Sequence, residues 1–249
     1  MARTIRQSLD SLLPQLDDSF EVVVCDNFSN DGSAEILEEY EAQGKLKLIR
    51  ARCNRGEGRQ IAFNHSQGEY IITGLDMDDT FKPTLPNILR EYNAKHSEFM
   101  VVYETVAVIP RLVVEKVGGW MPLSAYEDVE FGRRARAICG SKYMRFPAAS
   151  AIILKRGNKK HLGTLRMLRE IYVRAQISYA MNLRYPDTPN PSPVRRKVIA
   201  FVRWTAVRLL TNQSQTYKIL RSRGTLSEPQ PSECTRDLTK RNRRRNCRG

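Results

Sequence analysis

Apolar and polar residues along the first eighty positions follow two different spacings. Short apolar runs bounded by glycine or polar clusters predict strands at 21–25, 46–50 and 69–75. Apolar residues at helical spacing predict helices over 5–16, 33–43 and 59–67, with a loop at 54–58. The resulting order, α-β-α-β-α-β, is typical of an α/β protein whose parallel strands are joined by crossover helices.

The chain opens on a helix, whereas in such a fold a helix normally follows a strand. We therefore expect that an opening strand is missing from this chain, and a truncated N-terminus is the simplest explanation.

The second half continues the alternation and then changes in character. Helices are predicted over 83–95, 111–117 and 124–138, and strands within 99–109, 143–146 and 151–154. Basic helical patterns follow, separated by a proline-rich linker at 186–193, and the chain is polar beyond residue 227. We predict a catalytic-type α/β domain over 1–155, a basic helical extension over 156–226 and a disordered basic tail over 227–249.

Charge and composition restrict the classes of partner and compartment. The formal net charge is +14, most of the excess lies in the last hundred residues, and 41% of residues are hydrophobic. A basic surface points to anionic partners such as nucleotides, nucleic acid or an anionic membrane. No apolar run is long enough to span a bilayer, and the five cysteines form no short pairing motif. These features favour a reducing, cytoplasmic compartment.

Three carboxylates end the apolar run at 69–75, namely those of Asp76, Asp78 and Asp79. Acids grouped at the carboxyl end of a buried strand repel one another unless a cation lies among them. Hard oxygen ligands without histidine or cysteine suit Mg²⁺ or Mn²⁺, which typically also bind substrate phosphates. The alternative is a polar turn that leads into the next helix.

Three separated sequence motifs resemble those of the inverting nucleotide-sugar glycosyltransferases of family 2. The first runs from 22 to 33 (VVVCDNFSNDGS), the second combines Asn54-x-Gly56-x-x-Arg59 with 68–79, and the third joins 117–120 (VGGW) to 127–131 (EDVEF). The resemblance covers roughly residues 3–147. It implies the GT-A fold, a Rossmann-like mixed sheet with flanking helices, here lacking its first strand and followed by a basic helical extension.

The resemblance assigns nucleotide-sugar binding to Asp26, Arg59 and Asp76. A carboxylate at Asp26 would accept a hydrogen bond from the imide N–H of the base, although an Asx turn would explain the same residue. Arg59 would reach the diphosphate, or else is an exposed residue in the first turn of a helix. Asp78 and Asp79 would hold the Mn²⁺ or Mg²⁺ ion between the two phosphates.

The third motif carries the residues assigned to catalysis and to the acceptor. Asp128 matches the family's catalytic base, with Glu127 beside it, and would take the proton from the attacking hydroxyl. Two acids in the first turn of a helix are also favoured by the helix dipole alone. Trp120 would stack on an acceptor sugar, or else is an anchor of the core. Gln60 departs from the family, which usually has asparagine there.

The sequence thus favours a metal-dependent inverting glycosyltransferase with a nucleotide-diphosphate sugar as donor. The acceptor is expected to be a glycan or a polyprenyl lipid at the inner face of the cell membrane. The basic amphipathic helix predicted over 194–210 suits peripheral membrane contact, or else packs on the catalytic domain with its basic face in solvent. A degenerate homologue that binds a nucleotide sugar or a partner is the alternative function. Nucleic acid is not expected as a partner, because no recognised binding fold accompanies the basic tail.

Overall fold

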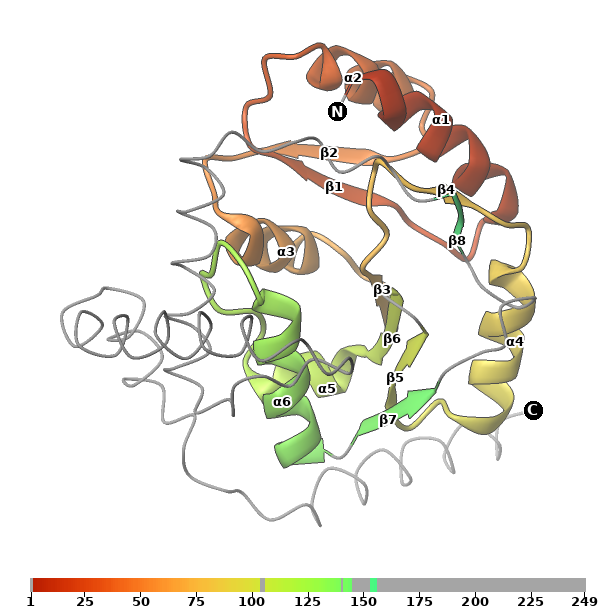
Figure 1. Cartoon of the computed structure of the whole chain (residues 1–249), viewed down its shortest axis with the longest axis vertical. Coiled ribbons are helices and arrows are strands. Elements are labelled where there is room, and N and C mark those ends of the chain that lie inside the picture. The colour runs from red at the N-terminus through yellow and green to blue at the C-terminus, as the bar shows by residue number, and fades with distance from the viewer. Residues whose placement is uncertain (1, 104–105, 140, 145–152, 156–249) are drawn as a thin grey trace, which may run out of the picture.

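The computed structural model describes residues 2–103, 106–139, 141–144 and 153–155. The predicted basic extension over 156–226 and the tail over 227–249 lie outside the described residues. Within the described part, helices and strands alternate along the chain in one mixed α/β arrangement (Figure 1). The α/β fold class predicted from the sequence is confirmed.

The N-terminal part forms a parallel strand pair covered by helices. Its elements are α1 (Ala2–Leu12), the 3₁₀ helix η1 (Leu13–Gln15), β1 (Val23–Asp26), α2 (Ser33–Ala42), β2 (Lys47–Arg50) and α3 (Arg55–Asn64). Apolar residues of α1 and α2, including Ile5 and Leu37, pack with Val24 on one face of β1. Helix α3 lies on the opposite side of this strand pair (Figure 1).

The remaining elements build a second sheet. They are β3 (Tyr70–Thr73), β4 (Thr80–Phe81), α4 (Leu85–Lys95), β5 (Met100–Tyr103), β6 (Val106–Pro110), α5 (Arg111–Val117), α6 (Glu127–Cys139), β7 (Ser141–Met144) and β8 (Ile153–Lys155). The sheet has the order β3-β6-β5-β7, with β5 and β7 parallel and the other neighbours antiparallel. Strands β4 and β8 form a separate antiparallel pair.

The three strands predicted in the first eighty residues do not form one parallel sheet. Strand β3 pairs with β6, and among the described residues it has no ladder to β1. A cavity of about 1050 Å³ lies between the two strands. The Glu21 carboxylate, just before β1, accepts the backbone N–H of Gln67 and, at 2.6 Å, that of Gly68, just before β3. The Glu21 side chain therefore ties the start of β1 to the start of β3.

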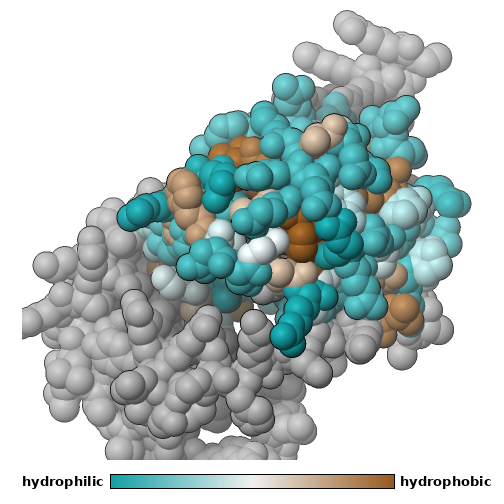
Figure 2. All heavy atoms as spheres, turned by 90° about the horizontal axis from the view of Figure 1, so that it is seen from above, coloured by the Kyte–Doolittle hydropathy of each residue, from teal (hydrophilic) through white to brown (hydrophobic). Residues whose placement is uncertain are grey.

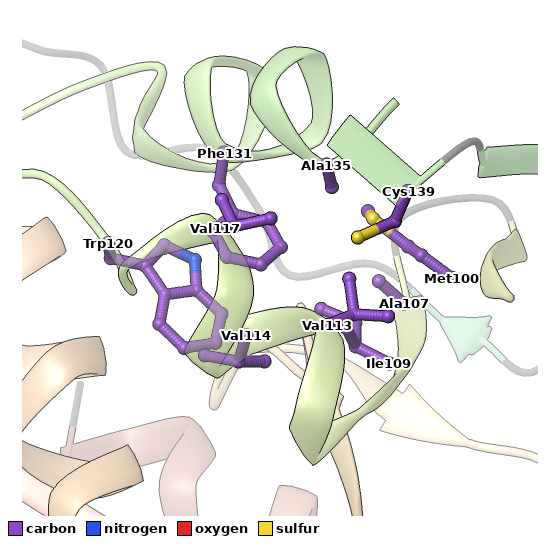
Figure 3. Packing of buried hydrophobic residues seen from close by; sticks show 10 residues of the cluster. All are labelled: Met100, Ala107, Ile109, Val113, Val114, Val117, Trp120, Phe131, Ala135 and Cys139. Carbon is purple, nitrogen blue, oxygen red and sulfur yellow. The ribbon is translucent and has the colours of Figure 1, made fainter. Parts of the chain in front are cut away.

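An apolar cluster under α5 and α6 fixes the position of the segment that joins them (Figure 3). The Trp120 ring is stacked on Phe131, with ring centroids 4.6 Å apart, and meets Phe63 of α3 edge to face. Gly118 ends α5 in the left-handed conformation with φ of +80°, which glycine adopts without strain. This packing places the start of α6 against the start of α3.

Residues 54–58 begin a helix, so their prediction as a loop was wrong. The Asn54 side chain accepts the Glu57 N–H at 3.0 Å, and the Glu57 carboxylate accepts the Asn54 N–H at 2.7 Å. This reciprocal pair is a capping box, which satisfies two backbone donors at the helix start. Glycine at 56 hid the signal, because glycine disfavours helix interiors.

The cysteines among the described residues are of two kinds. Cys139 takes part in a disulfide bond. Cys25 and Cys53 are free, and their sulfur atoms lie 3.7 Å apart beside the cavity between β1 and β3.

The face that carries α1 and α2 is mainly hydrophilic, with scattered apolar side chains between the polar ones (Figure 2). In the described part of the chain, no helix combines the length and the apolar character that a membrane crossing requires.

Candidate active site

Two arginines from the first turns of α3 point at a buried carboxylate of α6. Arg59 Nη2 lies 3.1 Å from Glu127 Oε1, and Arg55 Nε lies 3.9 Å from the same oxygen. Glu127 is 1% exposed, whereas the side chains of Arg59 and Arg55 are 21% and 57% exposed. The buried carboxylate therefore holds a cationic surface in place at the edge of a cleft.

These arginines only partly offset the cost of burying the Glu127 carboxylate. Burial raises its pKa above the ordinary value, Asp128 raises it further, and Arg59 and Arg55 act in the opposite direction. Its Oε2 atom is buried and has no hydrogen-bond partner among the described residues. A half-satisfied buried carboxylate is costly, which is typical of residues held for function.

Asp128 is the exposed member of the acidic pair at the start of α6. Its Oδ1 accepts the N–H of Val129 at 2.8 Å, and its position in the first turn suits an anion. The two predicted catalytic acids thus differ in environment, because Glu127 is buried against arginines and Asp128 is open to solvent. Only Asp128 is accessible to an incoming hydroxyl group.

The three predicted metal-site acids follow β3 in one tight turn, in which the Asp79 N–H bonds the Asp76 carbonyl at 3.0 Å. Asp76 is exposed, Asp78 is half-buried and Asp79 is 4% exposed. Partial loss of water contact raises the pKa of Asp76, the Asp79 and Asp78 carboxylates raise it further, and Arg59 and Arg55 lower it.

The same two arginines thus lower the pKa of Asp76 and that of Glu127, against the larger effect of burial. Arg55, Arg59 and Asp76 line one cavity, and both arginines approach Glu127, so the turn after β3, the start of α3 and the start of α6 meet at one site.

The positions of these acids suit a metal ion shared with a substrate better than one held by the protein alone. Among the described residues, no three acidic, histidine or cysteine side chains converge closely enough to hold a metal ion by themselves. Mg²⁺ and its relatives commonly use one or two carboxylates and complete their shell with substrate phosphates and water. Asp76 and Asp78, on the open side of the turn, fit this second arrangement, whereas Asp79 is buried.

Asp26 ends β1 and is 5% exposed. Its carboxylate accepts the Ser29 N–H at 3.1 Å and lies 3.6 Å from Arg50 Nε. The turn-closing alternative considered for this residue is therefore present in the structure. Its neighbours Cys25 and Asn27 line the cavity, and Arg55, Arg59 and Asp76 line the same cavity. Asp26 thus lies beside the site, and its contact with a nucleotide base stays a prediction.

Trp120 is 4% exposed, so its ring offers little surface on which an acceptor sugar could stack. It lies beside Phe131 in the apolar cluster (Figure 3) and also meets Phe63 edge to face, which is the position of a core anchor. The structure favours the core alternative over the acceptor role. The sugar-stacking interpretation failed because an aromatic residue after two glycines looks the same in sequence whether it is buried or exposed.

Two residues that hold the site were missed or undervalued in the sequence. Gln60 Oε1 accepts the Trp120 N–H at 2.8 Å and ties α3 to the turn before α6. Arg55 approaches Glu127 from one turn before Arg59, a spacing of four residues on one helix face. That spacing could have identified Arg55, had residues 54–58 been recognised as the first turn of α3.

Sequence comparison places this arrangement among known transferases. Residues 2–150 match Glycosyl transferase family 2. The chain is 30% identical over 104 residues to the putative glycosyltransferase EpsE of Bacillus subtilis, covering 40% of this chain and 37% of that protein. It is 31% identical over 87 residues to the poly(ribitol-phosphate) β-N-acetylglucosaminyltransferase TarS of Staphylococcus aureus, covering 33% of this chain and 15% of TarS. The chain therefore spans well under half the length of either relative.

Solved structures show the same fold. The mannosyltransferase PcManGT of Pyrobaculum calidifontis, in complex with GDP-Man and Mn²⁺, aligns with a TM-score of 0.56 at 18% identity, over 98% of this chain and 76% of that one. Residues 1–349 of S. aureus TarS with UDP align with a TM-score of 0.53 at 16% identity, over 82% of this chain and 67% of that one. With the family match spanning more than half of its residues, the chain belongs to glycosyltransferase family 2 and has the GT-A fold.

Proposed function

We propose that the protein transfers a sugar, with inversion, from a nucleotide-diphosphate donor to a glycan or lipid-linked acceptor. One observation carries the proposal: Arg59 and Arg55, which approach the buried Glu127, line the same cavity as Asp76, and the exposed Asp128 is next to Glu127. This arrangement offers cations for a diphosphate and a solvent-exposed carboxylate for an acceptor. The bound GDP-Man and UDP of the structural neighbours support the donor class.

Asp128 is the proposed catalytic base. As the acceptor oxygen forms its bond to the anomeric carbon, its proton passes to the Asp128 carboxylate and the bond from that carbon to the diphosphate breaks. The electron pair of the broken bond leaves with the nucleoside diphosphate. Attack from the face opposite the leaving group inverts the configuration, so no covalent intermediate with the protein forms.

Arg59 and Arg55 are the proposed ligands of the departing diphosphate. A guanidinium matches phosphate oxygens with two parallel N–H groups, and its charge stays fixed at any physiological pH. Glu127 holds the Arg59 guanidinium at 3.1 Å, so its orientation is set before the donor arrives. Asp76 and Asp78 would hold Mn²⁺ or Mg²⁺, which when bound neutralises charge on the diphosphate.

A panel of UDP-, GDP- and dTDP-sugars tests the proposal, with thermal stabilisation read with and without Mn²⁺. The preferred donor is then incubated with candidate glycan and polyprenyl-phosphate acceptors, and NMR gives the configuration of the product. Asp128→Asn should lower kcat by about 10²- to 10⁴-fold while donor stabilisation persists. The exposed acid Glu115, on α5, provides the control substitution Glu115→Gln.

Unchanged turnover in Asp128→Asn, or a product of retained configuration, would contradict the mechanism. Strands β1 and β3 belong to different sheets. For this reason we consider a second function, in which the protein binds a nucleotide sugar or a partner without turnover. Donor-dependent stabilisation without any product from the full acceptor panel would favour this second function.

A further inference from the structure

We propose that Cys25 and Cys53 form a reversible disulfide bond on exposure to a peroxide, and that this bond disturbs the start of α3. Both thiols are free and half-buried, and their sulfur atoms lie 3.7 Å apart. The proposed transfer reaction uses neither thiol. Formation of the bond is therefore independent of that reaction, whereas its effect on donor binding rests on the proposed function.

Two hydrogen bonds hold the segment of Cys53 against the end of β1. The Ala51 N–H donates to the Asp26 carbonyl at 3.0 Å, and the Cys53 N–H donates to the Asn27 side chain at 3.0 Å. Because these bonds join the immediate surroundings of the two cysteines, the thiols are kept close without a covalent link. Two groups held in this way react as if each were highly concentrated near the other.

Cys53 is the thiol expected to react first. Burial raises the pKa of Cys25, and the Cys53 sulfur and the Asp26 carboxylate raise it further, so Cys25 has little of the reactive thiolate. The Cys53 thiolate attacks hydrogen peroxide, the O–O bond breaks, and a sulfenic acid and hydroxide form. The Cys25 thiol then attacks the Cys53 sulfur, the S–O bond breaks, and the disulfide forms with release of water. In total the two thiols lose two electrons and two protons, and one peroxide is reduced to two waters.

Closing the bond requires a movement beside the first turn of α3. Cys25 is fixed within β1, where it pairs with Ile49 of β2, so Cys53 is the partner that moves. A disulfide has an S–S distance of about 2 Å, which is well below the present 3.7 Å. A Cβ added at Gly58 would lie 3.3 Å from the Cys53 sulfur and 3.9 Å from that of Cys25. Bond formation therefore changes a packed contact between Cys53 and α3.

The start of α3 also carries the arginines proposed to bind the diphosphate. Asn54, the next residue after the cysteine, accepts the Glu57 N–H at 3.0 Å and so caps the helix. A shift of this cap loosens the first turn, which includes Arg55 and precedes Arg59 by one turn. Arg59 lies 3.1 Å from Glu127 of α6, a distance that depends on the position of α3. Oxidation is therefore expected to weaken the binding of a nucleoside diphosphate.

Peptide mapping tests whether the bond forms. The full chain is treated with hydrogen peroxide, its remaining thiols are alkylated, and it is digested with trypsin without reduction. Trypsin places Cys25 in the peptide 7–45 and Cys53 in the peptide 53–55. The expected result is a species with the joint mass of these two peptides, which dithiothreitol separates. Absence of this species after peroxide treatment would overturn the proposal.

Amide hydrogen exchange followed by NMR reports on the start of α3 without any substrate. Oxidation should speed exchange at the amides of Glu57 and Gly58 by about tenfold, because both bond to Asn54 of the cap. Exchange in β5 and β6 should stay unchanged. UDP and GDP are then titrated by calorimetry in the presence of Mn²⁺. The affinity for the better-bound nucleotide should fall about tenfold on oxidation and return after dithiothreitol.

Cys25→Ser and Cys53→Ser are the matched variants, because each removes one sulfur and leaves the other thiol in place. Both should keep their exchange rates and nucleotide affinity after peroxide. Loss of affinity in these variants would overturn the proposal, because oxidation elsewhere would then be the cause. A cross-link with unchanged exchange at Glu57 would overturn the effect on α3. If the reduced protein binds neither UDP nor GDP, the proposed function fails, and exchange at Glu57 still decides whether the bond disturbs α3.

Discussion

At the scale of single residues, the two adjacent acids at the start of α6 are separated by burial rather than by chemistry. Glu127 is 1% exposed and paired with Arg59, whereas Asp128 is exposed. The sequence could identify the pair through its motif, but it could not say which acid faces solvent. That assignment depends on contacts between α3 and α6, which are distant in the sequence.

Glu127→Gln should raise the KM for the nucleotide sugar about tenfold with a smaller change in kcat. The amide keeps the shape of the side chain but removes the charge that orients Arg59, and a hydrogen bond to a charged group is worth about 1.5–3 kcal/mol. Steady-state kinetics with the preferred donor measure both constants. Glu130→Gln is the matched control, because Glu130 is equally buried but pairs with Arg134, at 2.5 Å. A collapse of kcat at constant KM would instead make Glu127 the base.

The raised pKa of Glu127 should appear in the pH dependence of stability. Its folded pKa lies above the ordinary value of 4.5, so protonation favours the folded state. The stabilisation is complete below the unfolded pKa and is lost as the pH rises through the folded pKa. Urea unfolding between pH 4 and 7 should show this decline in the wild type and a flatter profile in Glu127→Gln. Parallel profiles for the two proteins would contradict the burial argument.

The Cys25 thiol should resist alkylation in the folded protein. Burial, the neighbouring Cys53 sulfur and the Asp26 carboxylate raise its pKa from 9.0 to about 12. At pH 8 its thiolate fraction is then about 1,000-fold below that of an ordinary thiol, and the thiolate is the reactive form. Iodoacetamide labelling with mass-spectrometric mapping of the Cys25 peptide measures the rate. Labelling as fast as in denatured protein would show that the thiol is exposed.

At the scale of elements, boundaries were predictable where local signals decide them. Helix α5 has the predicted bounds because Gly118 ends it in the left-handed conformation. The start of α3 was missed because glycine at position 56 disfavours a helix locally. The need for glycine there comes from its contacts with residues that are distant in the sequence. A Cβ at Gly56 would lie 1.9 Å from the Met121 carbonyl oxygen, and the Gly56 N–H bonds the Leu123 carbonyl at 2.9 Å.

Gly56→Ala should therefore destabilise the protein much more than a glycine substitution in open space. The clash is with backbone atoms, so α3 and the segment before α6 must move apart, at a cost of about 3 kcal/mol or more. Gly118→Ala is the control, because nothing lies within 4 Å of its added Cβ. Its sole expected cost is that of an alanine in the left-handed conformation, about 1 kcal/mol. Thermal unfolding compares the two variants. Equal losses of stability in the two variants would show that α3 is not in close contact with residues 121–123.

At the scale of the whole molecule, the fold class followed from three separated motifs, but the division of the sheet did not. Apolar runs predicted each strand, yet a run alone does not say which neighbour it pairs with or in which direction. Strand β3 pairs antiparallel with β6, and the paired residues are 34–40 positions apart in the sequence, which no local pattern encodes. Among the described residues, the cavity beside β1 lies where the sheet is interrupted.

Charge is distributed unevenly over the whole chain, and this leads to a prediction about membranes. The net charge of +14 comes mostly from the last hundred residues, where basic and apolar positions alternate at helical spacing over 194–210. A basic segment gains about 1 kcal/mol per lysine or arginine near an anionic bilayer. We expect the protein to sediment with vesicles that contain phosphatidylserine and not with phosphatidylcholine vesicles.

Binding to these vesicles should fall steeply between 0.1 and 0.5 M salt, because the attraction is screened over about 10 Å or less in this range. A charge-only interaction would disappear at high salt, whereas an inserted amphipathic helix would leave a salt-resistant fraction. Substituting Phe201 and Trp204 by serine separates these cases, because it removes apolar anchors and keeps every charge. Loss of the salt-resistant fraction in this variant would support an interfacial helix, and with it a lipid-linked acceptor at the membrane surface. Equal sedimentation with neutral and anionic vesicles would contradict the electrostatic prediction.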